Sequence, residues 1–330
     1  QYHSTLPPPL IPGSEALYQE ITLLQQHFGG QINNLNPKPH GEYVSWRVWG
    51  LHQLLPLWRM NRQADLHHVF SAGLFPFPVM RLWTRPIVYT ITAGLELQNP
   101  PPWRFPARTT ITVTNARDGE KLKQWGLAPL IFPPVVDLRS FTYTPAPVSP
   151  TFTLLLASAP WTNEQFSSRG IDALLEVVRR ESHLRLILLW RGVLFEEITR
   201  SVQTLGIGAR VEIINEKADV GQLLARANAT VLLSASDQGV KAWPHSLIES
   251  LAAGKPVLVS RQIPMSVYVN EQQCGVIVDA PEPEQITRAL RQLLERYNEY
   301  QAAALRTGAR DFDLANTLRT WDNLYRTITQ

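Results

Sequence analysis

The residues best suited to chemistry in this sequence lie between Trp243 and Val259, in the stretch WPHSLIESLAAGKPVLV. Pro244, His245 and Ser246 open a predicted amphipathic helix, and Leu247 follows in its first turn. The unpaired backbone N–H groups and positive dipole end of such a turn attract anions such as phosphate. Glu249 follows one turn inside the helix, so the stretch predicts an anion site with a carboxylate beside it.

The same stretch predicts the end of the helix and a strand directly after it. Gly254 and Pro256 stop the helix, and Val257–Val259 form a short β-branched strand. A helix that leads back into a buried strand is typical of a parallel α/β sheet, in which ligands bind at the carboxyl ends of the strands. The pattern alone recurs in many doubly wound folds and does not select one function.

Alternating strands and helices continue over most of the chain and predict two α/β domains. A proline-rich stretch at 142–151, TYTPAPVSPT, separates them and indicates an extended linker. A chain of 330 residues is long enough for two cores. The predicted strands are 87–92, 109–114, 130–136, 152–157, 184–190, 210–214 and 229–234, and the predicted helices are 17–28, 115–126, 171–181, 196–205, 220–227, 283–297 and 314–328.

Composition favours a protein of a reducing compartment. Cys274 is the single cysteine, so no internal disulfide framework is available. No apolar run is long enough to span a bilayer, and the N-terminal residues lack a signal-peptide pattern. We therefore expect a cytoplasmic protein.

Charge is distributed unevenly between the two halves. Residues 1–148 carry twelve basic and eight acidic side chains, whereas residues 149–330 carry nineteen and twenty. Aromatic and basic residues interleave in Tyr43–Arg62, YVSWRVWGLHQLLPLWRMNR, which suits peripheral contact with lipid headgroups at the inner face of a membrane. The alternative is a buried helix edged with arginine. We expect no contact with nucleic acid, because the basic excess is small and no recognition motif is present.

The stretch around Glu249 resembles the donor-site helix of retaining GT-B glycosyltransferases, in the large family 4-like group that includes sucrose synthase-like and bacterial mannosyltransferase-like enzymes. That family typically has E-G-x-P-N-S-L-L-E-A-M-A-x-G-K-P-V. Glu249 matches its second glutamate, and Lys241 stands in place of the first. The resemblance implies an α/β fold with two Rossmann-like domains facing a central cleft. Residues 1–148 would form the acceptor-side domain, 149–311 the nucleotide-sugar domain, and 312–330 a helix that packs back on the first domain.

Further motifs of the second half match the donor side of this family. SSRGIDALLEVV places Arg169 at a cation that holds the donor diphosphate, but Ala157 and Ser158 occupy the place of a second arginine. Losing one of two phosphate cations weakens diphosphate binding by about 1.5–3 kcal/mol unless another group compensates. Lys241 is the candidate for that compensation, and Glu249 would accept hydrogen bonds from the ribose hydroxyls.

Motifs of the first half match the acceptor side with more departures. PPPLIPGSEALYQEI resembles a glycine loop, in which Gly13 and Ser14 would approach the donor phosphates and the acceptor. ADLHHVFSA resembles a D-x-x-H-x-H strand end, with Phe70 at the second histidine. A later segment has Thr92 where the family has a histidine. His68 is therefore the predicted residue for orienting the acceptor.

The resemblance implies transfer of a hexose from UDP- or GDP-sugar to a hydroxyl of a glycan or lipid-linked acceptor, with retention, as in bacterial cell-surface polysaccharide synthesis. It implies no metal and no cofactor beyond the nucleotide-sugar donor. Substitutions at Ser158, Lys241, Thr92 and Phe70 leave a second hypothesis open. In that hypothesis the chain is a degenerate homologue that binds a nucleotide sugar, a glycan or a partner without turnover. A nucleotide-sugar epimerase fits the pattern around Glu249 less well.

Overall fold

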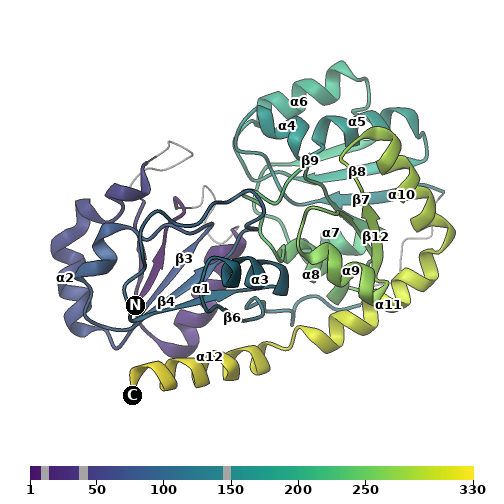
Figure 1. Ribbon diagram of the computed structural model, residues 1–330. Coiled ribbons are helices and arrows are strands. Elements are labelled where there is room, and N and C mark those ends of the chain that lie inside the picture. The colour runs from purple at the N-terminus through teal and green to yellow at the C-terminus, as the bar shows by residue number, and fades with distance from the viewer. Residues whose placement is uncertain (9–14, 37–43, 144–149) are drawn as a thin grey trace. The chain divides into compact units, whose positions relative to one another are not determined.

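The structure of the protein is a computed structural model that describes residues 1–8, 15–36, 44–143 and 150–330 (Figure 1). The chain divides into two compact units. Unit 1 comprises Gln1–Asp137, Asp237–Ala242 and Leu314–Gln330, and unit 2 comprises Leu138–Ser236 and Trp243–Asp313. No helix within the described ranges has the length and apolar character needed to cross a membrane.

Unit 1 is built on a parallel six-stranded sheet with the order β2-β1-β3-β4-β5-β6. Its strands are β1 (Tyr2–Ser4), β2 (Ile32–Asn34), β3 (His67–Ser71), β4 (Ile87–Ile91), β5 (Thr109–Val113) and β6 (Leu130–Ile131). Its helices are α1 (Ala16–Phe28), η1 (Trp46–Val48), η2 (Leu51–Gln53), α2 (Leu54–Gln63), η3 (Pro78–Leu82), α3 (Ala116–Gln124) and α12 (Leu314–Thr329).

Unit 2 repeats the architecture with the strand order β12-β11-β10-β7-β8-β9, again all parallel. Its strands are β7 (Phe152–Leu156), β8 (Leu184–Leu189), β9 (Val211–Ile214), β10 (Ala229–Leu232), β11 (Val257–Ser260) and β12 (Gly275–Val278). Its helices are α4 (Glu164–Ser168), α5 (Ile171–Arg180), α6 (Phe195–Thr204), α7 (Val220–Arg226), α8 (His245–Ala252), α9 (Met265–Gln272), α10 (Pro283–Glu295) and α11 (Tyr297–Asp311).

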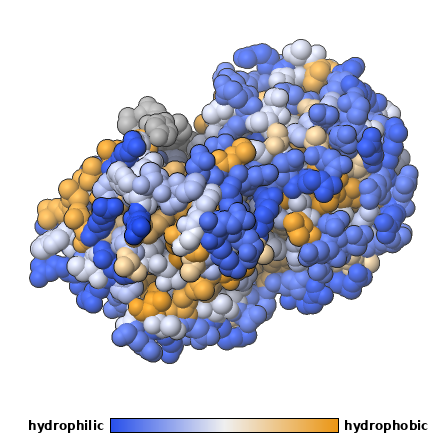
Figure 2. Space-filling model, in the orientation of Figure 1, coloured by the Kyte–Doolittle hydropathy of each residue, from blue (hydrophilic) through white to orange (hydrophobic). Residues whose placement is uncertain are grey.

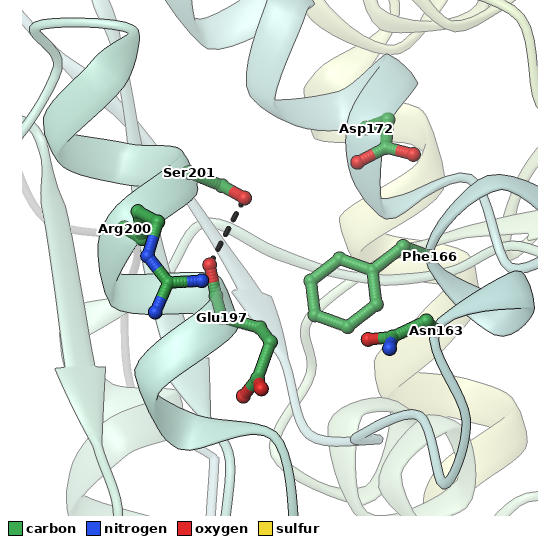
Figure 3. A pocket seen from close by; sticks show the side chains of 6 residues that line it. All are labelled: Asn163, Phe166, Asp172, Glu197, Arg200 and Ser201. Atoms are coloured by element: carbon green, nitrogen blue, oxygen red, sulfur yellow. Dashed lines mark hydrogen bonds between the residues drawn. The ribbon is translucent and has the colours of Figure 1, made fainter.

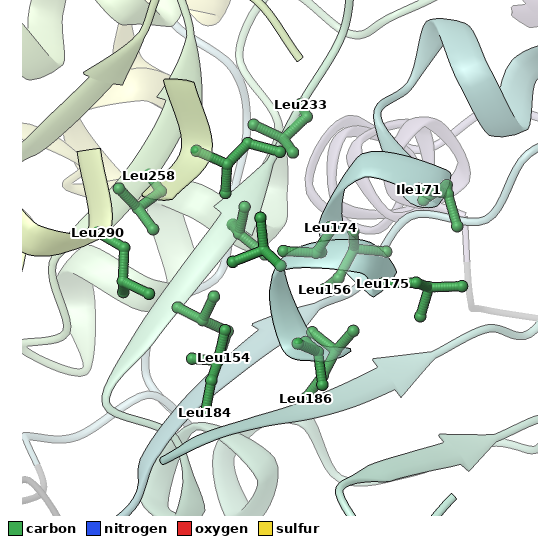
Figure 4. Close-up of a cluster of buried hydrophobic side chains, with 14 of the residues drawn as sticks. Leu154, Leu156, Ile171, Leu174, Leu175, Leu184, Leu186, Leu233, Leu258 and Leu290 are labelled. Carbon is green, nitrogen blue, oxygen red and sulfur yellow. The ribbon is translucent and has the colours of Figure 1, made fainter. Parts of the chain in front are cut away.

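The core of unit 2 explains why its strands are so apolar. Strands covered by helices on both faces must be hydrophobic on both faces, and all of β8 except Arg185 is buried. Leu154, Leu186 and Leu258 of three strands pack against Leu174 of α5 and Leu290 of α10 in one cluster (Figure 4). This layered core positions the strand ends that carry the polar residues.

Helix α12 belongs to unit 1, although it follows the helices of unit 2 in the sequence. Its residues Trp321 and Tyr325 lie one turn apart and are buried. The Trp321 ring lies 4.4 Å from the Phe132 ring, and the Tyr325 hydroxyl lies 2.6 Å from Nδ1 of His68. The helix thus covers the part of the sheet that holds β3.

The segment Asp237–Ala242 also belongs to unit 1, although it lies between β10 and α8 in the sequence. Lys241 forms an antiparallel bridge with Ala93, and the N–H of Ala242 donates to the carbonyl of Thr92 at 2.9 Å. The first division between the units therefore lies at 137/138, with this insertion, whereas the sequence prediction placed it at 148, with residues 312–330 returning to the first domain. Residues 144–149 of the predicted linker lie outside the described residues.

A buried carboxylate holds this segment in unit 1. Oδ2 of Asp237 accepts from Nη2 of Arg117 at 3.1 Å and from the N–H of Glu96 at 2.8 Å, and the Asp237 side chain is fully buried. We expect Arg117→Ala to lower the free energy of unfolding by about 3 kcal/mol, because it strands a buried charge. The Arg117 side chain is 36% exposed, which places the effect at the lower end of the range for buried pairs.

Denaturant titration of unit 1 measures this loss. Arg326→Ala is the matched control, because Arg326 pairs with Asp322 on the exposed side of α12 and exposed pairs contribute less than about 1 kcal/mol. Equal losses in the two variants would contradict the role of Asp237.

Candidate functional site

The order of strands in unit 2 creates a switch point between β7 and β10. The chain proceeds from β7 to β8 and β9 on one side, and from β10 to β11 and β12 on the other. In open α/β sheets, ligands bind outside the carboxyl ends of the strands at such a point, where the two flanking loops diverge. The loops that follow β7 and β10 therefore define the candidate site.

Helix α8 begins beside the carboxyl end of β10. Pro244 is its N-cap residue, and the side chains of His245 and Glu249 are buried one turn apart on the same face. Ser246 is partly exposed in the first turn. The predicted helix is thus present and begins at His245, and the predicted carboxylate of Glu249 is buried one turn inside it.

Leu247 does not serve the predicted donor contact. Its side chain is fully buried in the core, and its backbone N–H donates to the carbonyl of Pro244 at 3.1 Å. A leucine in the first turn faces inward because α8 packs against β10 and β11. The predicted donor contact of Leu247 is therefore corrected, and the backbone N–H groups of His245 and Ser246 remain the predicted anion contacts of this turn.

Arg169 lies between α4 and α5, in the loop region that follows β7. Its Nη1 is 3.4 Å from Ser158 Oγ and 3.4 Å from the carbonyl of Ala159. The guanidinium of Arg169 thus reaches Ser158, the position at which the sequence resemblance leads us to expect a second arginine.

Gly170 explains how Arg169 comes to the strand ends. Its backbone has φ +62°, and an added Cβ would lie 3.1 Å from Cβ of Leu233 at the end of β10. The N–H of Ala235 also donates to the carbonyl of Ser168 at 2.7 Å. The start of α5 therefore packs directly on the loop after β10, which only a glycine permits.

Lys241 is in unit 1 and pairs with a carboxylate there. Its ammonium forms an ion pair and hydrogen bond with Glu20 of α1, whose side chain is also buried. A buried pair of opposite charges satisfies both groups. The prediction that Lys241 replaces the missing phosphate cation is therefore not supported, because Glu20 already neutralises it.

His68 is a structural residue of the core of unit 1. It is fully buried on β3, with Nδ1 2.6 Å from the Tyr325 hydroxyl and Nε2 2.7 Å from Thr90 Oγ1. Its ring stacks on Phe70 at 4.0 Å, and burial holds its pKa well below the usual value. With both nitrogens engaged inside the sheet, His68 does not reach an acceptor, which corrects the prediction. Gly13 and Ser14, the other predicted acceptor-side residues, lie outside the described residues.

Hydroxyl groups gather instead at the carboxyl ends of β1, β3 and β4. Thr5 Oγ1 donates to Ser71 Oγ at 3.1 Å, and Thr92 Oγ1 donates to the Ser71 carbonyl at 3.2 Å. The switch point of unit 1 lies between β1 and β3. Sequence reasoning missed Thr5 and Ser71, although a hydroxyl residue directly after a buried strand is a signal for this edge.

The candidate site of unit 2 lies in a part of the chain that matches a known family. Residues 164–310 match the family model described as Glycosyl transferases group 1.

Solved structures match the whole length of the chain. Sucrose-phosphate synthase from Thermosynechococcus elongatus has 14% identity and a TM-score of 0.72, with 99% of each chain covered. Anabaena HepE in complex with UDP and glucose has 14% identity and a TM-score of 0.74, with 99% of each chain covered. WaaG, a glycosyltransferase involved in lipopolysaccharide biosynthesis, has 13% identity and a TM-score of 0.69, covering 98% of this chain and 99% of that chain. No curated protein matches the sequence.

The comparisons confirm the predicted fold class, since two parallel six-stranded α/β sheets match the structures of GT-B glycosyltransferases. The group 1 segment contains every residue predicted for the donor side. These are Arg169, Lys241, His245, Ser246, Leu247 and Glu249.

The group 1 segment also holds a fully buried lysine that sequence reasoning treated only as part of the helix stop. Lys255 follows Gly254 at the end of α8, and burial lowers the pKa of its ammonium to about 8. Its backbone N–H donates to the Ser250 carbonyl at 2.8 Å, and Ser250 Oγ donates to the Lys255 carbonyl at 3.1 Å. Lys255 thus fixes the end of α8 and remains mostly charged at neutral pH.

A surface hollow of about 280 Å³ lies between the first turns of α5 and α6 (Figure 3). Ser201 Oγ donates to the Glu197 carbonyl at 3.0 Å at its wall. Arg169 and Glu249 do not line it, so it is separate from the candidate donor site. Its lining residues are Asn163, Phe166, Asp172, Glu197, Arg200 and Ser201.

No group of three or more His, Cys, Asp or Glu side chains in the described ranges is arranged to hold a metal ion. The polar groups at the switch point of unit 2 are instead a guanidinium, a helix start and a carboxylate. Such groups bind anions and hydroxyls.

Proposed function

We propose that this protein transfers a hexose from UDP- or GDP-sugar to a hydroxyl group of a glycan or lipid-linked acceptor, with retention of configuration. The observation that carries the proposal is that Arg169 reaches the loop after β7, while α8 begins after β10, and these two strands flank the switch point inside the segment that matches the group 1 family. Donor binding of this kind is known for one structural neighbour, HepE, which was solved in complexes with UDP and UDP-glucose.

The proposed reaction breaks the bond between the sugar and the diphosphate. Positive charge develops on the sugar ring as it approaches an oxocarbenium ion, while negative charge grows on the departing diphosphate. Arg169 and the N–H groups of His245 and Ser246 stabilise that negative charge. The acceptor hydroxyl attacks the sugar carbon on the face from which the diphosphate departs and passes its proton to a diphosphate oxygen, so the configuration is retained.

Glu249 has a separate role in this proposal. A carboxylate accepts hydrogen bonds from two neighbouring hydroxyls, as the ribose of a nucleotide presents them. Its burial in α8 fixes its position relative to the helix start. We propose that the donor needs no metal, because the cation and the helix dipole supply the positive charge.

The configuration of the product tests the proposed function. The protein is incubated with α-linked UDP- and GDP-hexoses, and the released or transferred sugar is followed by NMR spectroscopy. We expect the α-anomer to form first, and Glu249→Gln to lower the rate by about 10-fold or more, because a neutral amide accepts the ribose hydrogen bonds less strongly.

Formation of the β-anomer first would contradict retention. Tight nucleotide binding without any turnover, over the whole set of donors, would instead favour the degenerate homologue.

A further inference from the structure

Helix α2 of unit 1 has apolar residues on two faces. Leu57 and Asn61 are buried against the core of the unit. Leu54, Leu55 and Trp58 lie on the adjoining side of the helix and are exposed, Leu55 and Trp58 to 57% and 54%. A helix that only covers a core needs one apolar stripe, so the second stripe calls for another explanation.

The exposed stripe runs along one side of the helix and its preceding turn. Leu51, Leu54, Leu55, Trp58 and Arg62 follow the spacing of one helical face, and we call these five residues the outer α2 face. Hydrophobic residues show at the surface over α2 in Figure 2. The described residues of unit 1 leave all five side chains exposed.

A neighbouring turn extends the outer α2 face. Asn61 on the inner side of α2 donates to Thr84 Oγ1 at 3.1 Å and accepts from the Thr84 N–H at 3.0 Å. This pair of hydrogen bonds fixes α2 beside the end of η3, where Leu82 is also exposed. The apolar surface therefore comes from two elements held together by Asn61.

The part of the chain that carries this apolar surface is rich in arginine. Residues 44–85 contain a single acidic residue, Asp65, and no lysine. The Arg62 guanidinium lies 4.8 Å from the centre of the Trp58 ring. Five arginines lie in this range and are exposed: Arg47, Arg59, Arg62, Arg81 and Arg85.

We propose that the outer α2 face docks unit 1 on a membrane surface that contains anionic lipids. Leucine and tryptophan side chains insert at the level of the headgroups, while arginine side chains extend to lipid phosphates. The charge pattern selects this occupant, because five exposed arginines and a single acidic residue give this range a net positive charge that anionic lipid headgroups neutralise. This inference goes beyond the proposed sugar transfer and uses none of the donor-site residues.

Vesicle binding tests this docking surface. The full chain is sedimented with phosphatidylcholine vesicles that contain no phosphatidylglycerol or about 30% of it, at rising salt concentration. We expect binding to the anionic vesicles that weakens with salt. The variant Leu55→Ser/Trp58→Ser should lose about 10-fold or more in partition coefficient, because two exposed apolar groups no longer insert.

Leu97→Ser is the matched control, since Leu97 is an exposed leucine of unit 1 that follows the carboxyl end of β4. It should bind as the unchanged protein does, and circular dichroism should show that both variants are folded. Three results would overturn the proposal: no binding to anionic vesicles, unchanged binding of the double variant, or dimerisation in solution that only the double variant abolishes. The last result would assign the outer α2 face to a second copy of the chain.

Discussion

Replacing Arg169 by alanine should lower the rate of sugar transfer by about 10²–10³-fold, the loss typical of removing one preorganised group that stabilises developing negative charge. Arg169 is the guanidinium that reaches both Ser158 and the loop after β7. Because Lys241 is paired with Glu20, it cannot take over this charge. Steady-state kinetics with the best donor measures the effect, and kcat should fall more than KM rises.

Arg179→Ala provides the matched control for this variant. Arg179 lies in the same unit on α5, is half-exposed, and pairs with Glu176 at 2.7 Å. Its loss should leave kcat unchanged and alter stability by less than about 1 kcal/mol. Similar losses of rate in both variants would contradict the position of the donor diphosphate at Arg169.

Mild acid should destabilise unit 1 strongly, because three histidines are held neutral in its core. Nε2 of His3 lies 2.9 Å from Nδ1 of His67, and Nε2 of His67 lies 3.1 Å from the Asn61 Oδ1. The Asn61 oxygen can only accept, so His67 donates to it and accepts from His3. Both rings stack on Trp83, at 4.6 and 4.2 Å, which leaves no room for a counter-ion.

The direction of the pH effect follows from these environments. Burial lowers the pKa of His67 to about 3 and holds the pKa values of His3 and His68 well below the usual value. In the unfolded chain each histidine binds a proton below about pH 6.5, whereas the folded unit does not. The stability contributed by the neutral histidines is therefore complete above about pH 6.5 and is lost as pH falls from there toward about 3.

The expected slope is about 1.4 kcal/mol per pH unit for each histidine, and about 4 kcal/mol per pH unit for the three together. Urea unfolding between about pH 7 and pH 5 measures it above the range in which most carboxylates titrate. His67→Gln should reduce the slope by one histidine, and exposed His52→Gln should leave it unchanged. A flat profile over this range would show that the histidines protonate inside the folded unit.

Sequence patterns predicted the elements with strong periodicity. The predicted helices near α5, α8 and α10 and the strands β7, β8 and β11 are confirmed within a few residues, because each combines an apolar stripe or run with a clear stop. Strands β1 and β2 could not be predicted in this way. Each has three residues, YHS and INN, and takes its strand geometry from neighbouring strands rather than from its own side chains.

In the candidate site too, features set by local sequence could be predicted and features set by tertiary packing could not. The helix start at His245 follows from local sequence, whereas the burial of a side chain and the close packing of Gly170 on Leu233 depend on distant parts of the chain. His68 was predicted to face an acceptor because its type suits that chemistry, yet Tyr325, which lies 257 residues away in the chain, occupies its Nδ1. In the same way, the sequence could not reveal that Lys241 forms an ion pair with Glu20.

The outer α2 face shows that sequence also does not tell which apolar residues of a helix remain at the surface. The sequence left open whether Leu51, Leu54, Leu55 and Leu57 pack against a core or whether their segment contacts lipid. The structure divides them, since only Leu57 is buried. That division depends on the fold of unit 1, which no local window of sequence contains.

Calorimetric titration of the full chain with UDP, GDP and their hexose derivatives tests the donor site at the start of α8 most directly. We predict saturable binding of one nucleoside diphosphate per chain, with a Kd between about 1 μM and 1 mM, as is typical of enzyme substrates. Absence of binding for every nucleotide and nucleotide sugar would contradict the assignment of Arg169, His245, Ser246 and Glu249 to a nucleotide-sugar site.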